Sequence, residues 1–271
     1  MSERDRVVEQ EPLAGDDYLI SDAGRERQLA FFRNPEVPDY IQRLVEDYIE
    51  RKTTKAWDDP VVLDRMRNAI LAQKSRYWKG QQVSYRKAYQ ILGYLAYHAP
   101  VYLVQFEHIL WQIIDQGLAK PHMRVLDVGT GPGVVPLAVI DLLGRIGGGS
   151  AEVYAIERSE EHFEAYNALV QAAAAAQGDA VRVEKPIRED IRALVVEDLP
   201  DRIDLMVFSN VLNELRDMAI EERADLVARL ADRLAPDGTI VVVEPADLEN
   251  ATAMRQTVRA IVDRGLTIYS P

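Results

Sequence analysis

Apolar residues in the first part of the chain recur every three or four positions, as they do in helices that bury one face. This spacing runs from residue 21 to residue 118, and hardly any segment there alternates as a half-buried strand would. Proline stands near the start of three segments, where helices tolerate it. The pattern predicts helices over residues 23–33, 38–53, 60–74, 83–97 and 100–117. The polar, acidic residues 1–20 predict a loose arm.

From Met123 onward, short apolar runs alternate with longer helical segments. Nearly continuous apolar runs are typical of parallel strands that are buried on both faces. The predicted strands cover residues 123–129, 151–157, 180–187, 203–210, 239–245 and 266–271. The predicted helices cover 133–146, 159–176, 190–197, 214–235 and 250–264, with turns at 147–149 and 236–238. This order predicts an α/β fold with a mainly parallel, Rossmann-like sheet over residues 119–271, after an all-helical N-terminal domain over residues 21–118.

A glycine loop follows the first predicted strand. Residues 125–133 read V-L-D-V-G-T-G-P-G, so Asp127 precedes Gly129, Gly131 and Gly133. Ligands of open parallel sheets bind beyond the carboxyl ends of the strands, and glycine lets the backbone approach them closely. A dinucleotide site normally carries G-x-G-x-x-G. The spacing G-x-G-x-G after an acid suits a cationic ligand better than a pyrophosphate.

The segment D-V-G-T-G-P-G resembles the first motif of the class I, seven-strand S-adenosylmethionine-dependent methyltransferases. The resemblance implies S-adenosylmethionine as cofactor, with the glycines against its methionine end and ribose. It also implies an acid that accepts hydrogen bonds from both ribose hydroxyls, and Glu157 ends the second predicted strand. A polar residue after the third strand often contacts the adenine amino group, and Asp190 is the candidate. Asp190 could instead be the N-terminal acid of the next predicted helix.

The fourth predicted strand ends in F-S-N-V-L-N-E-L, residues 208–215. The same resemblance implies that this end faces the transferred methyl group. Asn210 is a candidate for the methionine end or the target, and Asn213 and Glu214 are candidates for catalysis, Glu214 as a base. Asn213 and Glu214 could instead cap the following helix. The segment lacks the Pro-Pro-aromatic motif of enzymes that methylate exocyclic amines of bases, and the chain has no cysteine for carbon-5 methylation of pyrimidines.

A narrower resemblance involves S-N-V-L-N-E-L, residues 94–110 and V-V-V-E-P at 241–245. Together they are similar to the mitochondrial small-ribosomal-subunit methyltransferase-like family and its prokaryotic relatives, over about residues 80–271. The resemblance implies action on the small ribosomal subunit or its RNA. Members often continue with cysteines that can bind an iron–sulfur cluster. This sequence stops at Pro271, before a seventh strand, and we expect it to be a fragment.

The composition excludes several kinds of protein. The chain contains no cysteine, which excludes disulfides and fits a cytoplasmic protein. Its charged N-terminus is not a signal peptide, and no run is long and apolar enough to span a membrane. We expect no metal site, because the four histidines are scattered and predict structural or surface roles: His98, His108, His122 and His162. Four tyrosines at helical spacings predict core positions: Tyr89, Tyr94, Tyr97 and Tyr102.

The net charge of -12 is unevenly distributed. Residues 121–271 hold 15 Lys and Arg against 26 Asp and Glu, whereas residues 65–106 contain no acid. Cations alternate with aromatic residues over 74–87, a composition that favours contact with phosphates and unpaired bases. The candidate RNA-binding residues are Lys74, Arg76, Lys79, Arg86 and Lys87. Alternatively, the aromatic rings pack under the sheet domain, or the cations pair with the acidic half of the chain.

Three functions fit these features. The first is a methyltransferase that acts on the small ribosomal subunit or its RNA, with no DNA partner expected. The second is an RNA-binding assembly factor that keeps the fold without catalysis. The third is a methyltransferase of small molecules or proteins, with the helical region as a lid, and the acidic second half favours this reading somewhat over RNA.

Overall fold

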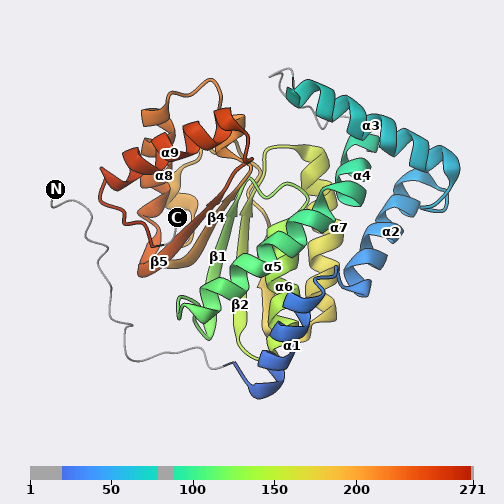
Figure 1. Cartoon of the computed structure of the whole chain (residues 1–271), viewed down its shortest axis with the longest axis horizontal. Coiled ribbons are helices and arrows are strands. Elements are labelled where there is room, and N and C mark those ends of the chain that lie inside the picture. The colour runs from blue at the N-terminus through green and yellow to red at the C-terminus, as the bar shows by residue number, and fades with distance from the viewer. Residues whose placement is uncertain (1–19, 79–87, 270–271) are drawn as a thin grey trace.

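The structure is a computed structural model that describes residues 20–78 and 88–269. At its centre lies a parallel sheet of five strands in the order β3-β2-β1-β4-β5 (Figure 1). The strand order reverses between β1 and β4, and ligands of open α/β sheets bind beyond the carboxyl ends of the strands at such a point. The strands are β1 (His122–Val128), β2 (Ser150–Ile156), β3 (Val181–Val183), β4 (Ile203–Ser209) and β5 (Leu234–Val243).

Successive strand residues alternate between two hydrophobic clusters, one on each face of the sheet. Val125 and Val207 belong to the first cluster, whereas Leu126 and Phe208 belong to the second. Helices α5, α6 and α7 cover the first face, and α8 and α9 cover the second (Figure 1). The predicted α/β class with a parallel sheet is confirmed. These helices are α5 (Ala99–Asp115), α6 (Val134–Ile146), α7 (Glu160–Ala176), α8 (Ile220–Ala231) and α9 (Leu248–Val262).

The N-terminal part of the chain forms helices, as its periodicity predicts. Helix α1 packs against α6, α2 against α7, and α4 against both α3 and α5. Phe31, Tyr48 and Trp111 are buried in the hydrophobic cluster of the first sheet face, so the helical region and the sheet share one core. Among the described residues, no helix is long and apolar enough to cross a membrane. The first four helices are α1 (Asp22–Arg33), α2 (Asp39–Thr53), α3 (Pro60–Trp78) and α4 (Ala88–Tyr97).

Three predicted elements differ from the structure in the second half of the chain. Residues 190–197 form a turn and one short 3-10 helix, Val196–Asp198, instead of a helix. The Asp190 carboxylate accepts the backbone N–H of Arg192 at 3.0 Å, and this local contact competes with helix formation. The predicted helix 214–235 is two elements, a 3-10 turn at Leu212–Glu214 and α8. Residues 266–269 contain no strand, and 270–271 lie outside the described residues.

Two further boundaries differ from the prediction. β3 contains only three residues, and an isolated bridge between Ile156 and Ile187 continues the pairing beyond Pro186, which has no N–H to donate. The predicted turn at 236–238 lies inside β5, where the register against β4 shifts between Ile203 and Leu205. The predicted arm falls almost wholly outside the described residues, as do positions 83–87 of a predicted helix.

Candidate functional site

The glycine loop joins β1 to α6 at the carboxyl edge of the sheet, and all three glycines have positive φ. A Cβ atom at Gly129 would lie 2.7 Å from the Val211 side chain, and one at Gly133 would lie 2.3 Å from Val170. These two glycines therefore allow close packing of the loop. Around Gly131, the nearest atom to an added Cβ is His162 Nδ1, at 3.9 Å. The backbone of Gly131 is thus open to a ligand on that side.

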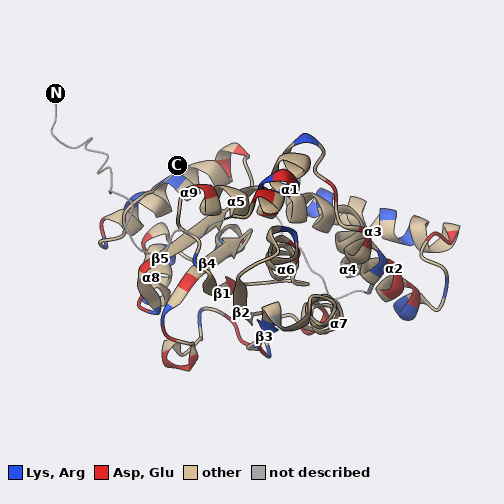
Figure 2. Cartoon of the chain, turned by 90° about the horizontal axis from the view of Figure 1, so that it is seen from below, with Lys and Arg blue, Asp and Glu red and all other residues tan. Residues whose placement is uncertain are grey.

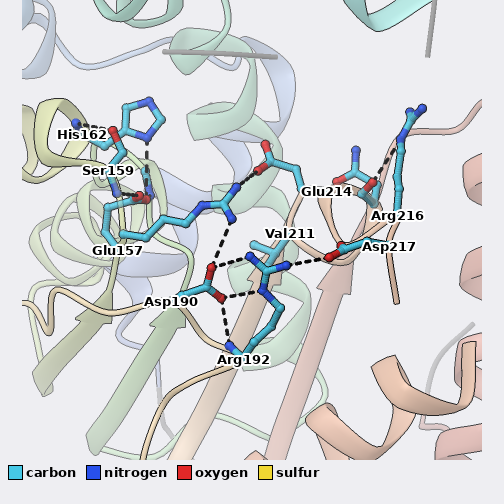
Figure 3. A network of polar contacts seen from close by, with 12 residues as sticks. Glu157, Ser159, His162, Asp190, Arg192, Val211, Glu214, Arg216 and Asp217 are labelled. Atoms are coloured by element: carbon cyan, nitrogen blue, oxygen red, sulfur yellow. Dashed lines mark hydrogen bonds and ion pairs between the residues drawn. The ribbon is translucent and has the colours of Figure 1, made fainter. Parts of the chain in front are cut away.

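Glu157 follows β2 directly and lies beside the glycine loop. Its carboxylate accepts hydrogen bonds from the N–H groups of Gly131 at 2.8 Å and Ser159 at 2.6 Å (Figure 3). His162 Nδ1 lies 3.7 Å from the same carboxylate. Burial raises the pKa of Glu157, but His162 and the two N–H groups outweigh burial and hold the pKa below its usual value. The structure therefore brings a buried, charged carboxylate into contact with the loop.

Asp127 lies within β1, under the glycine loop, and is 1% exposed. Neither of its carboxylate oxygens has a hydrogen-bond partner among the described residues, and the same is true of the Tyr166 hydroxyl. Burial raises the pKa of Asp127 to about 7; the nearby Thr130 hydroxyl acts to lower this pKa, and the charge of Glu157 acts to raise it. Buried polar atoms are normally satisfied, so these unpaired atoms mark a place where a polar ligand or water can bind.

The loop after β4 carries the other predicted residues. Asn210 adopts a left-handed backbone with φ of 54°, and its N–H donates to the Val243 carbonyl at 2.8 Å. The Asn213 side-chain oxygen is buried without a partner in the described part of the chain. Burial raises the pKa of Glu214, although 45% of its side chain stays exposed and water screens part of this effect. Neither Asn213 nor Glu214 caps α8, which begins only at Ile220.

An ion-pair network links the loops after β2, β3 and β4. The Arg158 guanidinium lies 3.4 Å from Asp190 and 3.4 Å from Glu214 (Figure 3). Arg192 pairs with Asp190 at 2.6 Å and with Asp217 at 2.8 Å. Its hydrogen bonds, together with Arg158, hold the pKa of Asp190 well below its usual range. Because no helix begins at Asp190, the alternative of a helix-terminal acid is wrong.

The comparison with family models decides the family of this chain. A family described as methyltransferase domain matches residues 105–270, more than half of the sequence. The chain belongs to this methyltransferase domain family. The match begins within α5 and covers the glycine loop, Glu157 and the β4 loop. No curated protein matches the methyltransferase chain in sequence.

Solved structures with a similar arrangement include three bacterial proteins. The YcgJ protein from Bacillus subtilis is 21% identical, with a TM-score of 0.34 over 51% of this chain and 50% of its own. The S-adenosylmethionine-dependent methyltransferase from Geobacter sulfurreducens, in complex with S-adenosyl-L-homocysteine, is 18% identical, with a TM-score of 0.36 and coverage of 51% and 47%. The equivalent complex from Thiobacillus denitrificans is 19% identical, with the same TM-score and coverage. The chain thus spans about half the length of these proteins.

The predicted RNA-binding residues are only partly described. Lys74 and Arg76 lie near the end of α3, whereas Lys79, Arg86 and Lys87 lie outside the described residues. The Lys74 ammonium donates to the Tyr97 hydroxyl at 2.8 Å and sits 4.4 Å from the centre of the Tyr97 ring. Within the described ranges, Lys74 therefore pairs with an aromatic residue and not with the acidic half of the methyltransferase chain.

Sequence reasoning missed or misassigned several residues of this site. His162 is buried, as a structural histidine would be, but its place beside the Glu157 carboxylate was not predicted. Tyr97 is 48% exposed, and Tyr89, Tyr94 and Tyr102 are only partly buried at the edge of the core. The prediction of core tyrosines is therefore wrong for Tyr97. Arg158 escaped notice, although its place directly after the acid of the second strand was a usable signal.

Proposed function

We propose that this chain is an S-adenosylmethionine-dependent methyltransferase. The observation that carries the proposal is the contact between the open glycine Gly131 and the buried carboxylate of Glu157, 2.8 Å apart, in a domain of the methyltransferase family. Such a pair combines close backbone approach with an acceptor for hydroxyl donors. In this proposal, Gly129, Gly131 and Gly133 line the methionine end and the ribose, with Glu157 on the ribose hydroxyls.

The residues of the site fit this cofactor. Each oxygen of Glu157 accepts one backbone N–H and can accept a second hydrogen bond. The two oxygens can therefore accept hydrogen bonds from the two ribose hydroxyls. The unpaired carboxylate of Asp127 lies under the loop, where it supports a cationic ligand. In our proposal Asp190 contacts the adenine amino group, which requires that Arg158 or Arg192 release one of its oxygens.

The β4 loop supports a division of roles during methyl transfer. S-adenosylmethionine supplies an electrophilic methyl group on a positively charged sulfur. We propose that Asn210 orients the methionine end or the acceptor and that Asn213 presents its unpaired oxygen to it. Glu214 has a raised pKa and an exposed edge, so it can take a proton from an acceptor atom that must lose one. Arg158, 3.4 Å away, stabilises the charged form of this carboxylate.

We further propose that the acceptor belongs to the small ribosomal subunit, most simply its RNA. The L-N-E-L segment and the V-V-V-E-P segment, through their resemblance to the ribosomal methyltransferase-like family, support this proposal. Cationic residues on α3, with Lys74 and Arg76 toward its end, add support (Figure 2). The competing readings are a non-catalytic assembly factor and a methyltransferase of proteins or small molecules.

The test is methyl transfer from tritiated S-adenosylmethionine into an extract of the source organism that lacks this gene. RNA, protein and small molecules are separated after the reaction, and a Gly131→Val variant is the control. Label in small-subunit RNA, absent with the variant, supports the full proposal. Label in protein or small molecules rejects the ribosomal acceptor. Absence of label, together with calorimetric binding of S-adenosylhomocysteine, rejects catalysis by this chain and favours the assembly factor.

A further inference from the structure

Glu244 stands directly after β5 and reaches across to the loop that follows β4. Its carboxylate accepts hydrogen bonds from three consecutive backbone N–H groups, those of Val211 at 3.2 Å, Leu212 at 2.8 Å and Asn213 at 3.2 Å. Three donors on one carboxylate fix both its position and that of the turn. A glutamine could not replace it without loss, because an amide has one acceptor oxygen and two N–H groups of its own.

The turn that Glu244 holds is also part of the glycine loop's surroundings. The Val211 side chain packs on Gly129 so closely that a Cβ atom there would lie 2.7 Å from it. The preceding residue, Asn210, donates its N–H to the carbonyl of Val243, the residue before Glu244. The end of β5 therefore fixes both the entry of the β4 loop and its turn. A shift of this turn would displace Val211 from the glycine loop.

The surroundings of Glu244 act on its charge in both directions. Arg223 is 8% exposed and lines the same small cavity as Glu244, Leu212 and Asn213. Its guanidinium donates to the Met218 carbonyl at 3.2 Å. Burial raises the pKa of Glu244 to about 7, the three N–H groups lower it, and the charge of Glu214 raises it. The folded protein therefore favours the protonated form of Glu244 more than water does, and this preference is lost as the pH rises through about 7.

We propose that Glu244 is a positioning residue of the cofactor site, which sets the distance between the β4 loop and the glycine loop. This inference rests on the proposed function, because it assigns Glu244 a part in cofactor binding. Glu244 acts through Val211 on Gly129, and through the turn on Asn213 and Glu214. It does not itself contact the cofactor.

The test compares Glu244→Gln with Glu249→Gln, an exposed glutamate in the first turn of α9, and with the wild type. Amide hydrogen exchange of residues 211–213 is measured without cofactor, as protection factors from pH 6 to pH 8. Calorimetry gives the affinity for S-adenosylhomocysteine. We expect about tenfold lower protection and about tenfold weaker affinity in Glu244→Gln, and no change in Glu249→Gln. In the wild type, protection falls as the pH rises from 6 to 8, because the closed turn holds a proton on Glu244 that an opened, hydrated turn releases. Glu244→Gln cannot ionise and shows no such fall.

Equal protection and equal pH dependence in Glu244→Gln and the wild type would overturn the inference. Lower protection with unchanged affinity would overturn it as well, because the turn would then not act on the cofactor site. If the wild type does not bind S-adenosylhomocysteine, the proposed function fails, and with it the role in cofactor binding, while the exchange data still decide whether Glu244 holds the turn. Should Glu244→Gln fail to fold, Glu244→Asp and the wild-type pH series carry the same test, since aspartate keeps the charge but shortens the reach.

Discussion

Gly131 is the residue whose replacement tests the cofactor site most directly. Its φ of 58° disfavours any residue with a Cβ atom, and a β-branched side chain would occupy the open side of the loop. We expect Gly131→Val to weaken binding of S-adenosylhomocysteine by more than about 100-fold, which is about 2.7 kcal/mol. Isothermal titration calorimetry measures the affinity.

A matched control separates the backbone strain from the loss of the site. Gly117 has a φ of 69°, and no atom lies within 4 Å of an added Cβ. Gly117→Val therefore introduces similar strain far from the glycine loop, and its affinity should equal that of the wild type. If both variants bind equally well, the ligand does not approach Gly131.

For single residues, the sequence predicts which residues belong to the site better than it predicts what each of them contacts. The three glycines and Glu157 stand out because strand ends and glycine spacing are local signals. Gly129 and Gly133 are needed because Val211 and Val170 pack against them, and these partners are too far away in the sequence to be predicted from it. The same holds for Glu244, whose partner Val211 is 33 residues away.

Buried ionisable side chains connect helix α6 to helix α5 of the N-terminal region. Arg145 lies 3.3 Å from Glu107, which is 0% exposed, and pairs with Asp141 one turn earlier in α6. Removing Arg145 leaves the buried Asp141 carboxylate without its charged partner. We expect Arg145→Met to lower the free energy of unfolding by about 3 kcal/mol in urea titrations.

The comparison variant is Arg25→Met, which breaks the exposed pair between α1 and Asp115 in α5. Both partners of that pair are more than 40% exposed, so its loss should cost less than about 1 kcal/mol. Equal losses in the two variants would mean that Arg145 does not compensate the buried acids.

Among the elements, long periodic segments could be predicted and segments governed by side-chain contacts could not. The helices α2, α6 and α7 follow their apolar spacing to within one residue at each end. Residues 190–197 read as a helix, but Asp190 binds Arg192 and Arg158 instead. The helix predicted from residue 214 begins at Ile220, after the turn that Glu244 fixes.

The whole molecule should lose stability as the pH rises from about 5 to about 8. Three buried acids have pKa values raised by burial: Asp127 and Glu244, each to about 7, and Glu107, which the neighbouring Asp141 raises further. A raised pKa means that the folded state holds a proton that the unfolded state has released. Its contribution to stability is complete below the unfolded pKa near 4 and is lost as the pH rises through the folded pKa. The lowered pKa values of Asp190 and Glu157 act in the opposite direction, but only in the acid range below this window. The lowered pKa of the partly buried His98 opposes the decline only up to its ordinary pKa of 6.5, and as a single group against three.

Urea titrations at intervals of one pH unit measure this decline, and Glu107→Gln identifies its largest source. The amide keeps the shape of the protonated acid but cannot ionise. Between the unfolded and the folded pKa of Glu107, the free energy of unfolding of the wild type should therefore fall by about 1.4 kcal/mol more per pH unit than that of Glu107→Gln. The exposed Glu26 supplies the control, since Glu26→Gln should leave the slope unchanged. A wild-type stability that is flat or rising from pH 5 to pH 8 would mean that these acids are ionised in the folded protein. The negative charges of Glu107, Asp127 and Glu244 would then need more compensation than the structure shows, since Arg145 pairs with Glu107 but the Asp127 oxygens have no hydrogen-bond partner among the described residues.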